Sequence, residues 1–248
     1  MILNEIIENL HTTSLGEKRI QKNLGLSSVN VIKFLKEKIK NPKCIIYQVG
    51  KNYYCDVDLI RITVNSSNYC IITAHPIKIC FYVPKIEDFW YQEKIQSDPS
   101  TMSYNAGYEV TYLGYHYDTG CVDFPKEKWK EVIKKRKEDS YFAYLQDSQF
   151  HSFLGYVYYQ YNAEKKYYDC GILIENSYRG RGYSFPALKQ LCDVARKNGI
   201  SELYDSFESD REHTLSLFQK VGFQIVEKQK WKKFGKEVEG VLVEIKLS

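Results

Sequence analysis

The sequence has no apolar run that approaches the roughly 20 residues of a membrane-spanning helix. Its first ten residues contain acidic side chains, with neither a basic segment nor a small-residue cleavage site, so we expect no secretory signal. It also has no internal repeats and no low-complexity tracts. With 44% hydrophobic and 27% charged residues in a chain of 248, it is typical of a folded, soluble protein with one large domain or two modest ones.

The seven cysteines follow no pattern of a metal site or a disulfide framework. No two of them are spaced as C-x-x-C, and their number is odd. The spacing argues against a zinc knuckle, and the odd number argues against a set of structural disulfides. We therefore expect free thiols in a reducing cytoplasm, and we expect no metal.

The net charge of +4 is distributed unequally along the chain. Residues 1–83 contain 11 Lys and Arg against 6 Asp and Glu, a net charge of +5, whereas residues 84–248 contain 24 against 25, a net charge of −1. Two parts with different electrostatics indicate two domains with different partners. We expect the boundary near Pro84, where the pattern of apolar residues changes.

The first domain, residues 1–83, is expected to be a small α+β domain. Apolar residues follow helical spacing over the first ten positions and again over residues 28–40, where Ser27 or Ser28 would be the N-cap. β-Branched and aromatic residues then predict four strands, at residues 44–49, 53–57, 59–64 and 69–73. Two helices and an antiparallel sheet are the predicted arrangement.

The second domain, residues 84–248, is expected to be a mixed α+β sheet flanked by helices. Helices are predicted from Pro125 to about residue 136, from the glycines near residue 182 to residue 198, and up to about residue 221. The predicted strands cover residues 107–117, 121–124, 140–145, 153–160, 167–174, 202–207, 223–229 and 238–245. A strand–helix–strand order after a run of antiparallel strands predicts a mixed sheet.

A glycine-rich segment, Gly171-Ile-Leu-Ile-Glu-Asn-Ser-Tyr-Arg-Gly-Arg-Gly-Tyr-Ser184, is the strongest indication of chemistry. The strand that ends at Ile174 is followed by a turn, and Gly180 and Gly182 precede the next helix. The start of a helix presents unpaired backbone N–H groups and a partial positive charge, which attract phosphate. Taken alone, two glycines before a helix are a weak signal, because a tight turn with cap glycines would explain them without any phosphate.

The segment resembles the pyrophosphate-binding signature of the GNAT superfamily of N-acetyltransferases, Arg/Gln-x-x-Gly-x-Gly/Ala, in which Arg179, Gly182 and Ser184 take the signature positions. A second block of that superfamily, Asn-x-x-Ala-x-x-Leu-Tyr-x-Lys-x-Gly-Phe, aligns with residues 211–223. Leu217, Lys220, Gly222 and Phe223 match it.

The resemblance implies that acetyl-CoA is the co-substrate. The backbone of residues 172–174 would pair with the pantetheine arm, and the sheet would open between that strand and the strand at 202–207 to admit the thioester. The amides of residues 179–184 would hold the pyrophosphate. The implied acetyl-CoA contacts are Ile172, Leu173, Ile174, Arg179, Gly180, Arg181, Gly182, Tyr183, Ser184, Arg211 and Phe218.

Two positions depart from the superfamily pattern. Arg211 stands where the pattern has asparagine, and Phe218 stands where it has the tyrosine that often protonates the leaving thiolate. Phenylalanine cannot donate a proton. A nearby tyrosine or a water would have to take that role, or the thiolate would leave without a positioned acid.

Acetyl transfer to an amine also requires a group that accepts a proton. Glu208, at the end of a strand that would face the opening, is the first candidate for a base or for holding a water. Glu175, just after the other strand, is the second. A solvated loop carboxylate is the alternative for each of them. Asp205 and His116 are lesser candidates.

The chain contains 22 tyrosines, and several of them precede the predicted core of the second domain. Tyr104, Tyr108 and Tyr112, together with His116, are expected to line an acceptor pocket, because aromatic faces suit a cationic amine. Half-buried tyrosines of an ordinary strand are the alternative.

The first domain resembles a small bacterial domain family without an assigned function. The matching residues include Leu10-His-Thr-Thr13 and Ile71-Ile-Thr-Ala-His75. Its two candidate functional residues are His11 and His75, which stand beside threonines in a lysine-rich domain. That combination is compatible with binding or cleaving RNA, and also with a binding or dimerisation module whose histidines are structural.

The sequence therefore predicts a cytoplasmic N-acetyltransferase that transfers acetyl from acetyl-CoA to a primary amine of an unidentified acceptor. The alternative is an acyl-CoA-binding sensor or accessory domain attached to an RNA-binding or RNA-cleaving domain. No membrane partner is expected.

Overall fold

The computed structural model describes residues 2–110, 114–135 and 140–247. Contacts between residues divide the chain into two units: residues 1–78 with 179–183, and residues 79–178 with 184–248. The expected domain limits, 1–83 and 84–248, stay a prediction. No helix among the described residues is long and apolar enough to cross a membrane.

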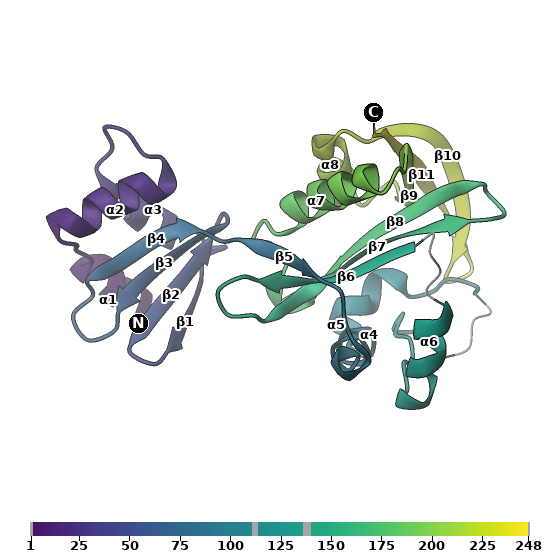
Figure 1. The fold of residues 1–248 in the computed structure, drawn as a ribbon, viewed down its shortest axis with the longest axis horizontal. Helices are drawn as coiled ribbons and strands as arrows, with labels where there is room; N and C mark the ends of the chain where they lie inside the picture. Colours follow the sequence, from purple (N-terminus) through teal and green to yellow (C-terminus); the bar gives the residue numbers. More distant parts are fainter. Residues whose placement is uncertain (1, 111–113, 136–139, 248) are drawn as a thin grey trace. The chain divides into compact units, whose positions relative to one another are not determined.

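The first unit consists of helices and a four-stranded antiparallel sheet in the order β1-β2-β3-β4 (Figure 1). The elements are α1 (Ile2–Asn9), α2 (Ser14–Leu24), α3 (Val31–Lys40), β1 (Ile45–Val49), β2 (Asn52–Val57), β3 (Ile60–Asn65) and β4 (Ile71–Pro76). The expected α+β arrangement is confirmed, but α2 was not predicted. Its few apolar residues lie among lysines, and its start depends on Thr13, whose side chain accepts a hydrogen bond from the amide of Gly16.

The core of the first unit lies between its helices and one face of the sheet. Ile20, Leu35 and Ile62 are fully buried there. The expected cap of the third helix was wrong: Ser28 has a φ of 57°, in the left-handed region, and the chain enters α3 through Asn30. The side chain of Asn30 accepts a hydrogen bond from the amide of Lys33 at 2.9 Å, which satisfies one of the free donors of the first turn.

The second unit is built on a seven-stranded mixed sheet in the order β10-β11-β9-β8-β7-β6-β5. Its strands are β5 (Ile79–Tyr82), β6 (Ser140–Asp147), β7 (Phe153–Asn162), β8 (Tyr167–Ile174), β9 (Glu202–Glu208), β10 (Gln224–Lys233) and β11 (Lys236–Lys246). All neighbouring strands are antiparallel except β8 and β9. The expected mixed sheet is therefore confirmed.

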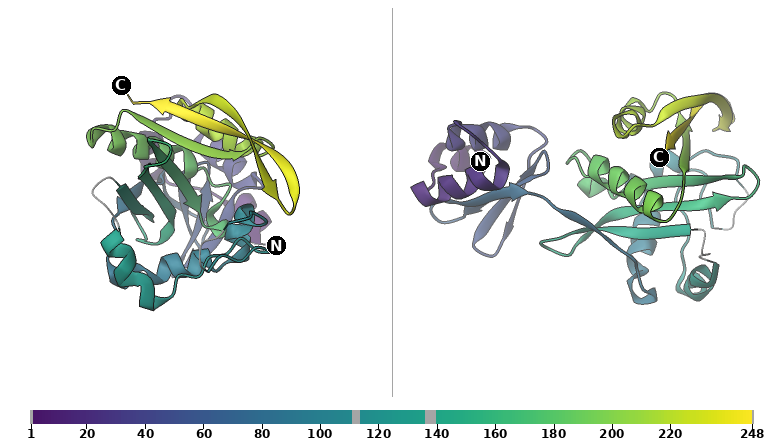
Figure 2. Two further views of the ribbon diagram at one scale, coloured as in Figure 1. Left: turned by 90° about the vertical axis from the view of Figure 1, so that its right-hand side faces the viewer. Right: turned by 45° about the horizontal axis from the view of Figure 1, so that its top comes forward.

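Helices cover both faces of this sheet (Figures 1 and 2). They are α4 (Trp90–Gln96), α5 (Pro99–Met102), α6 (Trp129–Lys135), α7 (Ser184–Lys197) and α8 (Glu212–Val221). Helices α7 and α8 lie on one face, and α4, α5 and α6 lie on the other.

Two expected strands of the second unit were wrong, and three of its elements were not predicted. Residues 107–117 and 121–124 were expected as strands, but their described parts make only isolated bridges, at Tyr108 with Lys233 and at Tyr115 with Val122. Helices α4 and α5 were not predicted, although Asp98-Pro99 is a helix start in which the Asp98 carboxylate accepts from the amide of Ser100. Strand β5 was not predicted either.

Candidate functional site

Strands β8 and β9 separate after a single register pair. Asp169 of β8 faces Tyr204 of β9, and no later residue of either strand forms a register pair with the other strand. On their outer sides both strands stay paired, since Ile174 faces Gly155 of β7 and Glu208 faces Gly240 of β11. The rings of Tyr167 and Tyr204 stack at 4.3 Å on the closed side of the pair. The sheet is therefore open between residues 170–174 and 205–208.

The glycine-rich segment follows the open end of β8. A short 3₁₀ turn (η4, Asn176–Tyr178) leads to Gly180 and Gly182, whose φ angles are 77° and 88°, and α7 begins at Ser184. This left-handed backbone favours glycine, which explains both glycines. The segment directly precedes the first turn of α7, and the first turn of a helix carries N–H groups that have no partner within the helix. Anion binding by residues 179–184 stays a prediction.

Glu208 lies at the end of β9 and is 5% exposed. Its Oε1 lies 2.5 Å from Lys233 Nζ, and its Oε2 lies 3.5 Å from Arg211 Nη1. Burial alone would raise the pKa of Glu208. Hydrogen bonds from Lys233 and Tyr108 together outweigh that effect, so the pKa of Glu208 lies below its ordinary value. Glu208 is therefore an ionised, paired carboxylate rather than a solvated one.

Tyr104 and Tyr108 both lie beside the cations that bind Glu208. The guanidinium of Arg211 lies 5.2 Å from the centre of the Tyr104 ring, and the ammonium of Lys233 lies 5.0 Å from that of Tyr108. Lys233 also donates a hydrogen bond to the carbonyl of Tyr104 at 3.0 Å. The two tyrosines thus line one side of the Glu208 ion pair, which the spacing of the sequence did not reveal.

The other two expected acceptor residues are not part of this arrangement. His116 is exposed, and its Nε2 lies 2.8 Å from Asp123 Oδ1. Tyr112 lies outside the described residues. The role of both in acceptor binding stays a prediction.

Glu175, the first residue after β8, is 8% exposed. Its Oε1 accepts hydrogen bonds from Lys94 at 2.9 Å and from Ser177 at 3.0 Å. Its Oε2 and the hydroxyl of Tyr91 are both buried, and the two side chains interact with each other. Burial first, and the charge of Glu175 second, raise the pKa of Tyr91. The second candidate carboxylate is thus tied to α4.

Asp205 lies on β9 directly after Tyr204, where the two strands separate. It is half-buried, and its Oδ1 accepts a hydrogen bond from the amide of Ser206 at 2.8 Å. Burial raises the pKa of Asp205 to about 7, with a smaller contribution from the charge of Asp169.

Tyr158 of β7 was not among the predicted site residues. Its ring covers Gly171 of β8 so closely that a Cβ at that position would lie 2.5 Å from the ring. Burial, followed by the charge of Asp205, raises the pKa of Tyr158 well above its ordinary value. The signal in the sequence was Gly171 itself, because a glycine inside a strand often marks a close approach.

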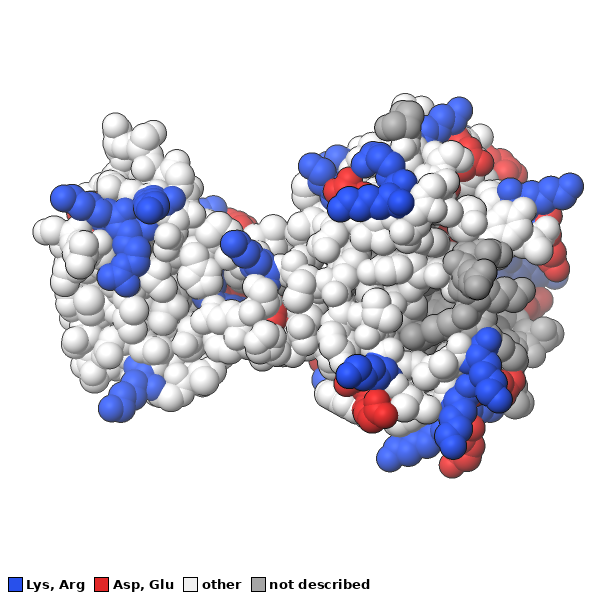
Figure 3. Space-filling model, viewed as in Figure 1, with Lys and Arg blue, Asp and Glu red and all other residues white. Residues whose placement is uncertain are grey.

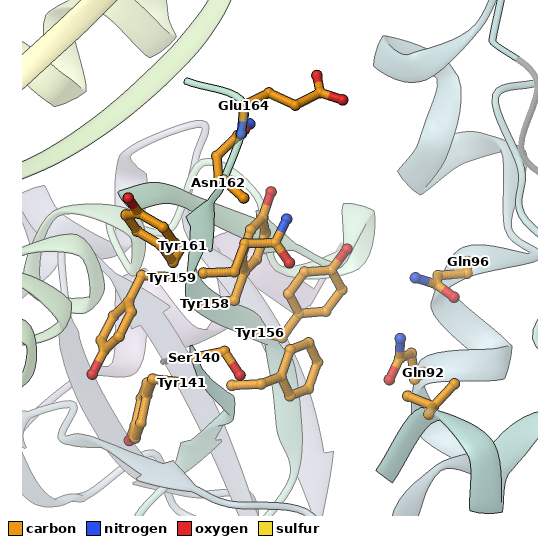
Figure 4. Close-up of a pocket in the computed structure, with 14 residues that line it drawn as sticks. Gln92, Gln96, Ser140, Tyr141, Tyr156, Tyr158, Tyr159, Tyr161, Asn162 and Glu164 are labelled. Carbon is orange, nitrogen blue, oxygen red and sulfur yellow. The ribbon is translucent and has the colours of Figure 1, made fainter. Parts of the chain in front are cut away.

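A trough of about 870 Å³ extends from Tyr158 along β7, on the side of the sheet that carries α4. Phe142 and Tyr156 line it together with Tyr158, and Gln92 and Gln96 of α4 face them across open space (Figure 4). The Oε1 atoms of both glutamines are buried, without a hydrogen-bond partner among the described residues. The volume lies within the range of small-molecule sites.

Phe218 of α8 is 1% exposed and packs between Phe207 and Phe223, with ring centres 5.2 Å and 4.8 Å away. It is a core residue in this chain and carries no hydroxyl. Arg211 is the residue before α8, where its side chain reaches Glu208. Contact of these two residues with acetyl-CoA stays a prediction.

The two histidine candidates of the first unit lie apart. His11 forms a bridge with Cys70, before the start of β4, whereas His75 is near the end of β4. Five residues of extended strand separate the two positions by roughly 16 Å, too far for a paired acid and base. On the face drawn in Figure 3, few acidic side chains interrupt the lysines and arginines of this unit. Within the described parts of the chain, no group of three potential metal ligands occurs.

Comparison with known proteins gives a result for each part of the chain. The model of the family described as "Acetyltransferase (GNAT) family" matches residues 87–223. The model described as "Protein of unknown function (DUF3781)" matches residues 4–75. No curated protein matches the chain.

Solved structures share the fold of the second unit at low identity. The spermidine N-acetyltransferase of Vibrio cholerae, solved with CoA and spermine, has a TM-score of 0.56 and 14% identity over 68% of this chain and 95% of its own. The Salmonella typhimurium protein yncA, solved with acetyl-CoA, has a TM-score of 0.54 and 15% identity over 69% and 94%. An N-acetyltransferase of Staphylococcus aureus Mu50 has a TM-score of 0.53 and 17% identity over 69% and 99%.

Proposed function

This chain belongs to the acetyltransferase (GNAT) family, and we propose that it transfers the acetyl group of acetyl-CoA to a primary amine. The observation that carries the proposal is the separation of β8 and β9 beyond Asp169 and Tyr204. An open seam between two parallel strands offers one strand edge to an extended ligand, in the way that an added strand would pair with it.

The residues around the seam fit acetyl-CoA. The edge of Ile172–Ile174 would pair with the pantetheine amides. The amides of residues 179–184, with Arg179 and Arg181, would hold the diphosphate, because left-handed glycines keep side chains away from the approaching anion. The GNAT structures solved with CoA or acetyl-CoA support this choice of co-substrate.

The acceptor would lie on the α4 side of the sheet. The trough leads to Tyr158, which lies over β8 next to the seam. No lysine or arginine lines the described part of the trough, and its floor is aromatic. Aromatic faces attract ammonium groups, and buried amide oxygens can accept their hydrogen bonds. Both features suit an amine.

Glu208 and Glu175 stay the proposed carboxylates of the site. The lowered pKa of Glu208 makes it a weak proton acceptor at neutral pH, so holding a water or the acceptor's ammonium is the role that its ion pair favours. The buried Oε2 of Glu175, beside Tyr91, supports a comparable role at the other strand. Phe218 has no hydroxyl with which to protonate the leaving thiolate.

The test is release of free CoA by the purified full chain. We would incubate it with acetyl-CoA and a panel of 1,4-diaminobutane, phenethylamine and Nα-acetyllysine, and in parallel measure acetyl-CoA binding by calorimetry. We expect binding, and CoA release with at least one amine. Binding without release across the panel would favour the sensor alternative, and absence of binding would refute both.

A further inference from the structure

Helix α4 carries two glutamines beside the row of side chains that packs it onto the sheet. Tyr91 and Ile95, one turn apart, are buried in the same cluster as Tyr156 of β7. Gln92 and Gln96 follow each of them by one residue, so they form a second row, about a quarter of a turn further around the helix. This second row lines the trough that extends along β7.

Gln92 is buried, but its terminal amide is not satisfied within the described chain. The residue is 8% exposed, and its Oε1 has no hydrogen-bond partner among the described residues. Gln96 is half-buried, and its Oε1 also lacks a described partner. A buried carbonyl oxygen without a partner costs stability, so its presence in a native structure requires an explanation. A ligand that donates hydrogen bonds would satisfy both oxygens.

Aromatic rings form the wall opposite the glutamines. The ring centre of Tyr156 lies 5.1 Å from that of Phe142 and 6.3 Å from that of Tyr158. Figure 4 shows Tyr156 and Tyr158 on one side of the open space and the two glutamine side chains on the other. Aromatic faces attract cations and N–H groups, and carbonyl oxygens accept hydrogen bonds from the same groups. Both walls therefore favour a ligand group that carries N–H donors.

The charges around the trough disfavour an acidic ligand group. Glu164 is the one charged side chain among the described lining residues, and it is exposed in the turn after β7. Lys94, the basic residue of α4, is two positions from either glutamine, and side chains at that spacing do not face each other. Its ammonium binds Glu175 at 2.9 Å. Among the described residues, no cation is thus placed to bind a carboxylate or a phosphate in the trough.

We propose that Gln92 is a specificity-determining residue, which selects acceptors that carry a second N–H donor group, an ammonium or a carboxamide, in addition to the reacting amine. The proposal rests on the proposed function. With the reacting amine beside Tyr158 at the seam, the rest of the acceptor extends along the trough, and its second N–H group pairs with Oε1 of Gln92. Gln96 supplies the second oxygen. An acceptor with a carboxylate at that place is rejected, because two oxygens would face each other without a proton between them.

The experiment compares four acceptors that share the reacting amine and a chain of five carbons, and that differ only in the remote group. They are 1,5-diaminopentane, 5-aminopentanamide, pentylamine and 5-aminopentanoate. We expect kcat/KM of the unaltered chain, measured by CoA release, to be highest for one of the first two, lower for pentylamine and lowest for 5-aminopentanoate. The order of the first two shows whether the site prefers a cation or an amide. Series with one carbon fewer and one carbon more are run in parallel, because chain length decides whether the remote group reaches Gln92.

Gln92→Leu removes the amide and keeps a side chain of similar size. For the preferred acceptor, kcat/KM should fall by about tenfold, the contribution of a hydrogen bond in a desolvated site, whereas the value for pentylamine should not fall. The matched control is Gln219→Leu, because Gln219 is exposed on α8, on the opposite face of the sheet. That control should keep the order of the four acceptors.

Stability distinguishes recognition from a structural role. If the amide of Gln92 supported the fold, Gln92→Leu would lower the melting temperature of the ligand-free chain. We expect the variant to be at least as stable as the unaltered chain, because apolar atoms replace a buried oxygen that has no partner among the described residues. A lower melting temperature together with an equal loss of kcat/KM for all acceptors would overturn the proposal.

The outcomes separate this proposal from the proposed function. If the unaltered chain releases CoA but treats pentylamine and the N–H-bearing acceptors alike at every chain length, or if Gln92→Leu keeps the original preference, Gln92 does not determine specificity and the proposed function stands. If the unaltered chain releases CoA with none of these acceptors and with no amine of the earlier panel, the proposed function fails, and the role of Gln92 is refuted with it.

Discussion

The Nζ atom of Lys233 lies 2.5 Å from Oε1 of Glu208, which ties the last residue of β10 to the last residue of β9. The same ammonium binds the carbonyl of Tyr104. One cation therefore joins the seam, the β10–β11 hairpin and the 3₁₀ turn that follows α5 (η2, Ser103–Asn105). The position of Glu208 at the open end of the seam therefore depends on its contact with Lys233.

Glu208→Gln should destabilise the chain, because it removes the charge that compensates a mostly buried ammonium. Leaving a buried polar group poorly paired costs about 1–3 kcal/mol. The matched control is Glu237→Gln, whose pair with Lys230 is also in the β10–β11 hairpin but is exposed, and which should change stability by less than about 1 kcal/mol. Urea unfolding at pH 7 measures both, and equal effects would contradict the importance of the buried pair.

The pH dependence of that effect has a definite sign. The pKa of Glu208 is lowered in the folded chain, so its contribution is present above the ordinary glutamate pKa of about 4.3 and is lost as the pH falls through the folded value. The stability gap between the unaltered chain and Glu208→Gln should therefore narrow in acid. A stability difference that grew below pH 4 would contradict a lowered pKa of Glu208 in the folded chain.

Asp205→Asn should behave in the opposite way. The pKa of Asp205 is raised to about 7 in the folded chain, so the contribution of its protonated form is lost as the pH rises from about 4 to about 7. Asparagine does not ionise and avoids this loss. The melting temperature of the variant relative to the unaltered chain should therefore be higher at pH 8 than at pH 5, as scanning calorimetry at the two pH values would show.

Much of the fold followed from local patterns. The glycines at 180 and 182 predicted the turn before α7, and their φ angles agree. The strands from Phe153 to Ile174 followed from their β-branched and aromatic residues. Helices α4 and α5 were not predicted, because helices of seven and four residues are too short to show a long apolar stripe, and only Asp98-Pro99 marked a start.

The site was less predictable, because its contacts are non-local. Glu208 was selected for its place at the end of β9, but Lys233 reaches it from a hairpin 25 residues away. Nothing in the local sequence distinguishes a glutamate that forms an ion pair from an aspartate three positions earlier that forms none with the described residues. The pairing of β9 on one side and its separation on the other decide the difference.

Gly171→Ala should disturb the seam through Tyr158, because a Cβ there would lie 2.5 Å from the Tyr158 ring. Overpacking of this kind costs about 1–3 kcal/mol. In the background of Tyr158→Ala, the same change should be neutral or stabilising, since glycine in a strand is entropically unfavourable. A double-mutant cycle by urea unfolding measures the coupling between the two positions. Additive effects would show that the Tyr158 ring moves aside without a cost in stability.

The first unit allows an independent stability prediction. Arg61 donates two hydrogen bonds to Asp56, at 2.8 Å and 2.7 Å, from adjacent positions on β2 and β3, and both residues are almost fully buried. Asp56→Asn should cost about 3–5 kcal/mol, because it removes the anion that the buried guanidinium of Arg61 binds. The double variant Asp56→Leu with Arg61→Met should recover most of that loss. Chemical unfolding followed by circular dichroism would test both, and a double variant less stable than Asp56→Asn would contradict the account.

Acetyl-CoA binding can be tested with two glycines that differ only in their place relative to α7. Gly180 precedes the helix and Gly199 follows it; both are exposed, with φ angles of 77° and 80°, and a Cβ at either would meet no atom within 4 Å. Glu at either position therefore carries a similar backbone strain, so the two variants should lose similar stability. Only Gly180→Glu places a negative charge where the diphosphate would lie, and it should weaken acetyl-CoA binding by at least about tenfold, or 1.4 kcal/mol, while Gly199→Glu binds as the unaltered chain does. Calorimetric titration with acetyl-CoA measures the difference. Equal affinities for the two variants would place the diphosphate elsewhere, because the N-terminus of α7 would then make no contribution that a carboxylate could disturb.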